Sequence, residues 1–223
     1  MRALIAGLAC VLALAQAAPA LAQADDGFCR NGLFGEENPG FGLARITGTD
    51  KARFYLDADG CPRQSAACLD KPYVLPGDRV VTGRSKAGFT CVYFPNAGGG
   101  TAGWMPAARL TALRVDPAPP LAAWLGRWND HDNTLRFTRR RDGLWVEGRA
   151  YWPSARPDPA FRPGGPNIGT MAGMVGRTGN RGSEPGCGVT FHLLGDIIVA
   201  ADPGRACDGM NVTFSGVYLR QKR

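Results

Sequence analysis

The residues that decide the fold class run from Tyr73 to Leu113, YVLPGDRVVTGRSKAGFTCVYFPNAGGGTAGWMPAARLTAL. The apolar runs in this stretch are short and lie between turn-forming segments rich in glycine, proline and asparagine. They are Val80–Val81, Phe89–Phe94 and Trp104–Met105. Short β-rich runs between glycine-rich turns are typical of a compact antiparallel barrel. The stretch therefore predicts an all-β domain.

The order of parts in this stretch resembles a bacterial Src-homology-3-like domain. A turn at Pro76–Asp78 precedes a valine-rich strand. An aromatic strand at Cys91–Phe94 follows, and Gly103–Pro106 leads to a closing Leu110. The resemblance covers about residues 46–113.

This resemblance implies a small β-barrel with a shallow aromatic groove that binds extended peptides. It makes Tyr55, Tyr93 and Trp104 candidate ligand-binding residues. The chain departs from the family at two places. Phe54–Asp57 stands where the family has a different strand, and a cysteine-bearing insert occupies Cys61–Cys68.

The first 22 residues predict a cleaved export signal. Arg2 gives a positive start, Ala3–Ala18 is apolar, and Ala20-Leu21-Ala22 fits the cleavage rule of small residues. The apolar run is shorter than the ~20 residues that a bilayer span requires. A retained anchor is the alternative. We expect a periplasmic or secreted protein without a transmembrane segment after cleavage.

The net charge of the chain is moderately positive. Removing residues 1–22 takes away one of 26 basic residues and none of 19 acidic ones, so the net charge falls from +7 to +6. Nucleic-acid-binding proteins concentrate such charge in a recognisable module, whereas here it is dispersed. We therefore expect no nucleic-acid partner. A weak attraction to anionic envelope polymers is the more reasonable implication.

The cysteine count predicts disulfide bonds. Six of the seven cysteines remain after removal of the signal, and an even number in an exported chain is typical of disulfides. Cys187 and Cys207 are the only cysteines after the proline-rich residues 114–120, so we expect them to pair. The four earlier cysteines allow three connectivities. Of these we prefer Cys61–Cys68 together with Cys29–Cys91. Without a Cys-x-x-Cys pair, and with only two histidines, we expect no metal ion and no other cofactor.

The chain divides into an arm, two domains and a linker. Residues 23–45 are glycine-rich and predict an N-terminal arm, followed by the first domain at 46–113. Residues 114–120 contain three prolines in four positions and predict a semi-rigid linker. Residues 121–223 predict a second antiparallel β domain.

The second domain has the pattern of a closed meander barrel. About six strands are expected, separated by glycine-containing turns, and closure removes exposed strand edges. The predicted strands are Thr134–Thr138, Leu144–Trp152, Asn167–Val175, Cys187–Leu194, Ile197–Ala201 and Asn211–Tyr218. Asp142-Gly143 predicts a tight hairpin turn between the first two.

One segment suggests nucleophilic catalysis. Ser183–Val189 loosely resembles the nucleophile segment of cell-wall L,D-transpeptidases, with His192 five residues after Cys187. In one strand this odd offset would place the two side chains on opposite faces, ~16 Å apart. The family's upstream His-Gly segment is missing, as is the Asp-Cys-Ser-Gly segment of NlpC/P60 peptidases. We therefore expect no catalytic residues and a protein that is not an enzyme.

The sequence favours an exported, non-catalytic binding protein of the cell envelope. Its partner would be peptidoglycan, another anionic envelope polymer or an envelope protein. Two loops of the second domain carry the arginines that we expect to contact an anion: Arg156, Arg162, Arg177 and Arg181. One alternative is a secreted inhibitor of a lysozyme-type enzyme, although a basic inhibitor would repel a basic lysozyme at long range. A second is a wall-acting enzyme that uses Cys187.

Overall fold

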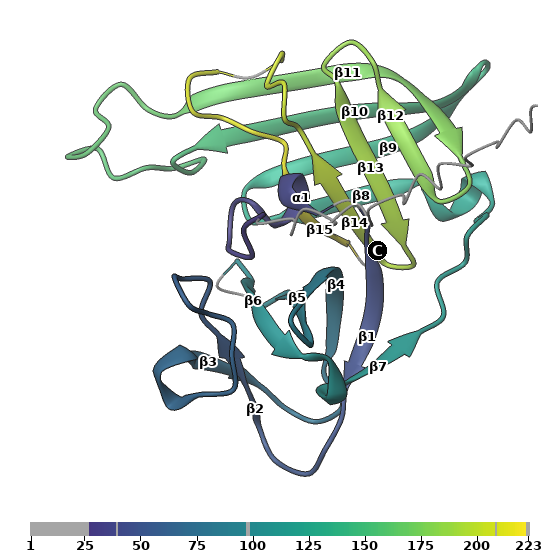
Figure 1. Ribbon diagram of the computed structural model, residues 1–223. Helices are drawn as coiled ribbons and strands as arrows, with labels where there is room; N and C mark the ends of the chain where they lie inside the picture. Colours follow the sequence, from purple (N-terminus) through teal and green to yellow (C-terminus); the bar gives the residue numbers. More distant parts are fainter. Residues whose placement is uncertain (1–26, 39, 97–98, 208, 222–223) are drawn as a thin grey trace, which may run out of the picture.

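The protein folds into an antiparallel sheet followed by a closed antiparallel barrel (Figure 1). This computed structural model describes residues 27–38, 40–96, 99–207 and 209–221. The predicted export signal lies outside the described residues. The all-β fold class is confirmed. Within the described part of the chain, no helix has the length and apolar character needed to cross a membrane.

The first sheet has seven strands in the order β3-β2-β6-β5-β4-β1-β7. The strands are β1 (Gly42–Ile46), β2 (Ala52–Tyr55), β3 (Leu69–Val74), β4 (Arg79–Lys86), β5 (Phe89–Phe94), β6 (Thr101–Pro106) and β7 (Leu110–Leu113). β5 packs on both faces because its residues alternate between two apolar clusters. Cys91 and Tyr93 face the barrel, and Val92 packs with Met105 on the other side.

The barrel has eight strands in the order β10-β11-β12-β13-β14-β15-β8-β9, so that β15 pairs with β8 to close it. Its strands are β8 (Gly126–Asp130), β9 (Asn133–Arg140), β10 (Gly143–Trp152), β11 (Asn167–Thr178), β12 (Arg181–Glu184), β13 (Val189–Leu194), β14 (Ile197–Ala201) and β15 (Gly216–Arg220). In the described part of the chain, the helical turns are α1 (Phe34–Glu37) and three 3₁₀ turns at Ala66–Cys68, Ala107–Arg109 and Leu121–Ala123.

Side chains fill the interior of the barrel. Leu144, Val146 and Ala150 point inward from β10, as their alternation predicts. Trp124 and Trp128 are fully buried, and the Trp128 indole nitrogen donates a hydrogen bond to the Trp124 carbonyl at 3.0 Å. The barrel therefore has a packed core, and any ligand must bind to its outer surface or its ends.

The barrel differs from the sequence-based expectation at three places. β8 was not anticipated, and β12 lies inside the segment 176–186 that was expected to be a loop. The last strand begins at Gly216 rather than Asn211, because Asn211 has a positive φ of 63°. These short elements contain glycine, arginine or acidic residues, and their pairing with longer neighbours holds them in the sheet.

The tight turn between β9 and β10 lies one residue earlier than predicted. Arg140 pairs with Gly143, so Arg141 and Asp142 form the turn. Gly143 has a φ of 136°, a conformation that side chains with a Cβ rarely adopt. The glycine is therefore required at the first residue of β10 and not within the turn itself.

We expect Gly143→Val to lower the free energy of unfolding by about 1 kcal/mol or more, because valine is strained at this φ. A Cβ at this position would also lie 3.4 Å from the terminal methyl group of Met174. Thermal unfolding of the variant measures the effect. Asp142→Ala is the matched control and should change the unfolding temperature little. Equal stability of Gly143→Val and the wild type would contradict this role.

An apolar cluster joins the sheet to the barrel. It contains Leu43, Val81, Phe89, Cys91, Tyr93 and Trp104 from the sheet, with Leu194, Ile197, Val199 and Val217 from the barrel. β14 is apolar along its whole length because both of its faces are buried. Ile198 and Ala200 face the barrel interior, while Ile197 and Val199 face the sheet. The two parts therefore share a continuous core.

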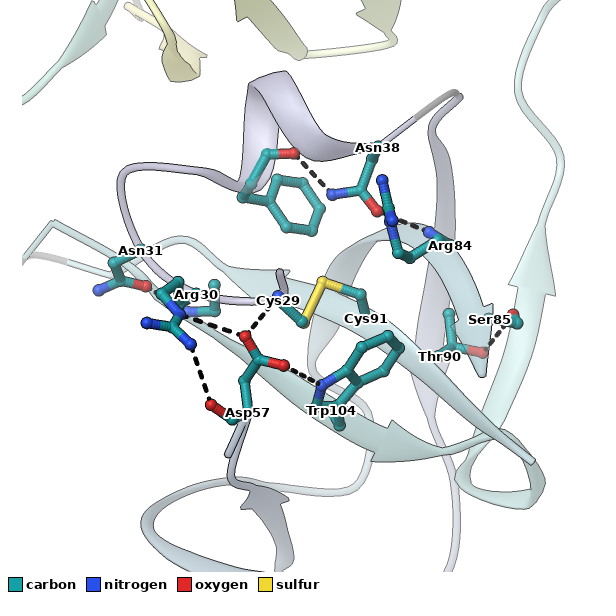
Figure 2. Close-up of a disulfide and its surroundings, with 12 residues drawn as sticks. Cys29, Arg30, Asn31, Asn38, Asp57, Arg84, Ser85, Thr90, Cys91 and Trp104 are labelled. Carbon is teal, nitrogen blue, oxygen red and sulfur yellow. Dashed lines mark hydrogen bonds and ion pairs between the residues drawn. A yellow bond between two sulfur atoms is a disulfide. The ribbon is translucent and has the colours of Figure 1, made fainter. Parts of the chain in front are cut away.

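The N-terminal arm lies between the sheet and the barrel, with α1 close to β14 and β15 (Figure 1). A disulfide ties Cys29 of the arm to Cys91 of β5 (Figure 2). The Asp57 carboxylate accepts hydrogen bonds from the Cys29 backbone nitrogen at 3.0 Å, from Arg30 Nε at 3.2 Å and from the indole nitrogen of Trp104 at 3.1 Å. Further along, Asn38 accepts from the Arg84 backbone nitrogen at 2.7 Å.

The three expected disulfides are confirmed. Cys29 pairs with Cys91, Cys61 with Cys68, and Cys187 with Cys207. Their Cα–Cα distances are 5.5, 5.7 and 5.1 Å, within the range that a disulfide requires.

Candidate functional site: an arginine face on the barrel

The aromatic candidates of the first sheet do not form an exposed ligand groove. Trp104 is fully buried and Tyr93 is 6% exposed, both in the cluster shared with the barrel. The Tyr93 hydroxyl donates to the Gly99 carbonyl at 2.6 Å, and burial raises the pKa of this group. Tyr55 is half-buried, with its ring 4.9 Å from that of Phe89. The barrel covers this face of the sheet, so a peptide cannot stack on these rings here.

The four candidate arginines lie in different surroundings. Arg162 donates to the Asn167 side chain at 2.6 Å, and Arg177 donates to the Pro119 carbonyl at 3.3 Å. Arg181, on β12, lines a groove beside the arm. Arg156 is exposed in the loop that precedes β11. The structure does not bring these four together, because the two loops leave opposite ends of β11.

A different set of arginines gathers on the outer face of β8, β9 and β10. Arg127 of β8 lies directly opposite Arg136 of β9, and Arg149 of β10 lies opposite Thr134 of β9. All three arginines are exposed because the inward positions beside them, such as Trp128 and Leu135, fill the core. We call Arg127, Arg136 and Arg149 the arginine face.

Two hollows adjoin the arginine face. The larger, of about 910 Å³, is lined by Arg127, Arg136 and Arg139 and by Arg220 at the end of the barrel. The smaller, of about 570 Å³, extends from Arg127 and Arg136 to Arg149. Arg127 and Arg136 line both hollows, so both guanidinium groups are within reach of one extended ligand.

The charges of the arginine face are largely uncompensated. Glu147, on β10 opposite Arg136, forms an ion pair with Arg140 at 3.4 Å. Arg140 also stacks on Trp145, with its guanidinium carbon 3.9 Å from the ring centroid. Among the described residues, no hydrogen bond or ion pair is made by the guanidinium groups of Arg127, Arg136 and Arg149. Like charges directly opposite on neighbouring strands are destabilising. The Arg127–Arg136 pair is therefore unfavourable, and Glu147 opposite Arg136 offsets only part of this cost because it also pairs with Arg140.

Arg220 has a structural role beside this face. It donates hydrogen bonds to the carbonyls of Leu125, at 2.7 Å, and Ala123, and its guanidinium carbon lies 3.9 Å from the Trp128 ring centroid. Burial lowers the pKa of Arg220, and Asp196 acts in the opposite direction. Through these hydrogen bonds, Arg220 of β15 stabilises the position of the 3₁₀ turn at Leu121–Ala123.

The chemistry suggested for Cys187 requires a free thiol, and the disulfide with Cys207 leaves none in this structure. Cys187 is buried in the barrel core, whereas His192 lies on the outer face of β13. Within the described ranges, no cluster of three or more His, Cys, Asp or Glu side chains has the arrangement of a metal site.

Sequence reasoning missed the arginine face because β8 was not anticipated. In β9 the polar residues Thr134, Arg136 and Thr138 alternate with the apolar Leu135 and Phe137, a pattern typical of a strand with one exposed face. The missing element was β8, which pairs with β9 in a hairpin and places Arg127 opposite Arg136. Comparison with known protein families, curated proteins and solved structures found no match to this chain.

Proposed function

We propose that this chain is an exported, non-catalytic binding protein of the cell envelope that holds an anionic polymer on its arginine face. The observation that carries the proposal is the direct opposition of Arg127 and Arg136, with Arg149 beside them, while the nearby Glu147 forms its ion pair with Arg140. Guanidinium groups suit carboxylates and phosphates because their planar fork binds bidentately.

Two further observations support the proposal. Three disulfides fit an oxidising compartment outside the cytoplasm. The resemblance of residues 46–113 to Src-homology-3-like domains, which often accompany wall-acting proteins, favours the same compartment.

Sedimentation with purified peptidoglycan sacculi at low and high salt tests the proposal. The Arg127→Ala/Arg136→Ala/Arg149→Ala variant should lose roughly tenfold or more in affinity, since exposed charge pairs contribute ~0.2–1 kcal/mol each. Binding by the wild type should weaken at high salt, because exposed charges are screened over ~8–10 Å at physiological ionic strength.

The matched control is Arg63→Ala/Lys71→Ala/Arg114→Ala, which removes the same charge from other exposed positions. It should bind like the wild type. Equal losses in both triple variants would show that only net charge matters and would overturn the arginine face as the site. Binding that salt and both variants leave unchanged would also contradict it.

A further inference from the structure

A groove of about 460 Å³ lies between the N-terminal arm and the outer face of β11–β14. The arm contributes Glu36 and Phe41, and the barrel contributes Arg181, Ser183, Thr190 and His192. This volume falls in the range of small-molecule sites, ~300–1,000 Å³. The groove is separate from the arginine face, which lies on β8–β10.

The strand register arranges four polar side chains of this groove as a block. Arg181 lies directly opposite His192, and Ser183 lies directly opposite Thr190. Directly opposite side chains are ~5 Å apart at Cβ, and alternate residues along a strand are ~7 Å apart. The block therefore presents a guanidinium, two hydroxyls and an imidazole over an area comparable to one sugar ring.

The His192 ring packs against Phe41 of the arm, and one of its nitrogen atoms makes no hydrogen bond to the described residues. Its ring meets Phe41 edge-on, with centroids 5.3 Å apart and an interplanar angle of 89°. Its Nδ1 is buried and has no hydrogen-bond partner among the described residues. Burial, with a smaller effect from Arg181, lowers the pKa of His192 to about 4, so the ring is neutral at physiological pH. A neutral imidazole can exchange a hydrogen bond with a ligand hydroxyl.

The charges in the groove favour a single carboxylate on the ligand. Arg181 is exposed and has no ion pair with any other described residue, whereas the Glu36 carboxylate accepts a hydrogen bond from Ser215 at 2.6 Å. Val199 and Phe41 give the groove an apolar wall. Hydroxyls on one side of the groove and apolar surface on the other match the hydroxyl-bearing edge and the C–H face of a pyranose ring.

We propose that this groove binds a sugar acid of the hexuronate type, that is, one pyranose ring with one carboxylate. Arg181 pairs with the carboxylate through its fork. Ser183 and Thr190 exchange hydrogen bonds with ring hydroxyls, and the C–H face of the ring packs on Phe41 and Val199. The arm forms one wall of the groove, and the Cys29–Cys91 disulfide holds the arm in position against the sheet.

Titration with D-glucuronate, followed by calorimetry and by NMR of the His192 ring, tests this site in the full chain. D-glucose is the matched ligand, since it differs only in carrying a neutral hydroxymethyl group in place of the carboxylate. Glucuronate should shift the His192 resonances at millimolar concentration, and glucose should bind about tenfold or more weakly, because a hydrogen bond to a charged group is worth ~1.5–3 kcal/mol.

Arg181→Gln should reduce glucuronate affinity to that of glucose, and Arg136→Gln, on the arginine face, should leave it unchanged. Ser183→Ala should weaken both sugars. No binding of glucuronate, equal binding of the two sugars, or an Arg181→Gln variant that behaves like the wild type would each overturn the site. A loss on Arg136→Gln instead would assign the sugar acid to the arginine face and would also overturn it.

Discussion

Replacing both Cys29 and Cys91 by alanine should lower the free energy of unfolding by about 4 kcal/mol, the largest stability effect that we expect for this chain. The two cysteines are 62 residues apart, and the entropy that a disulfide removes from the unfolded chain grows with the length of the loop it closes. The same change frees the arm, which forms part of the core between sheet and barrel.

Denaturant unfolding under oxidising conditions measures this effect. The Cys61→Ala/Cys68→Ala variant is the control, because its cysteines are only seven residues apart and its loss should be about 2 kcal/mol. If the control lost more free energy of unfolding than the Cys29/Cys91 variant, the result would contradict a dominant stabilising role for the Cys29–Cys91 disulfide.

Asp130→Asn should raise the stability of the protein near pH 7 by up to about 2–3 kcal/mol. Asp130 lies at the end of β8, where the seam between sheet and barrel buries it near Tyr93, and it accepts a hydrogen bond from the Val217 backbone nitrogen at 3.2 Å. Burial raises its pKa to about 6 from the ordinary 3.8, although the bond from Val217 and the neighbouring His131 lower it.

The pH dependence of this effect has a definite sign. Between pH 3.8 and about 6 the folded state holds a proton on Asp130 that the unfolded chain has released. The contribution of Asp130 to stability is therefore fully present below pH 3.8 and is lost as the pH rises to about 6. Asparagine keeps an acceptor for Val217 and carries no charge, so the variant should lack this loss.

Thermal unfolding of wild type and Asp130→Asn across pH 4 to 7 provides the test. His192, whose pKa burial lowers to about 4, acts in the opposite direction, since its contribution rises with pH up to 6.5. The difference between the two proteins removes that shared contribution. A difference that stays constant with pH would show that Asp130 has an ordinary pKa in the folded protein.

The sequence by itself determined the all-β class, the inward face of β10 and the disulfide between Cys187 and Cys207. Each of these depends on local pattern or on simple exclusion. Alternation placed Val146 inside, and the distribution of cysteines around the proline-rich segment left Cys207 as the partner of Cys187. The apolar run Phe89–Phe94 coincides with β5, whereas the predicted aromatic strand, Cys91–Phe94, covers only its last four residues.

Only the tertiary structure decided which candidate residues are exposed at the surface. Tyr93 and Trp104 are aromatic residues of a strand, and whether they lie on a groove or in a core depends on Ile197 and Val217, more than 90 residues away in the sequence. Arg127 and Arg136 become neighbours when β8 pairs with β9 across the turn at His131–Asp132, and β8 itself is held in the sheet by its pairing with the distant β15. Strand pairing between distant segments is set by the burial of shared apolar surface, which no local pattern records.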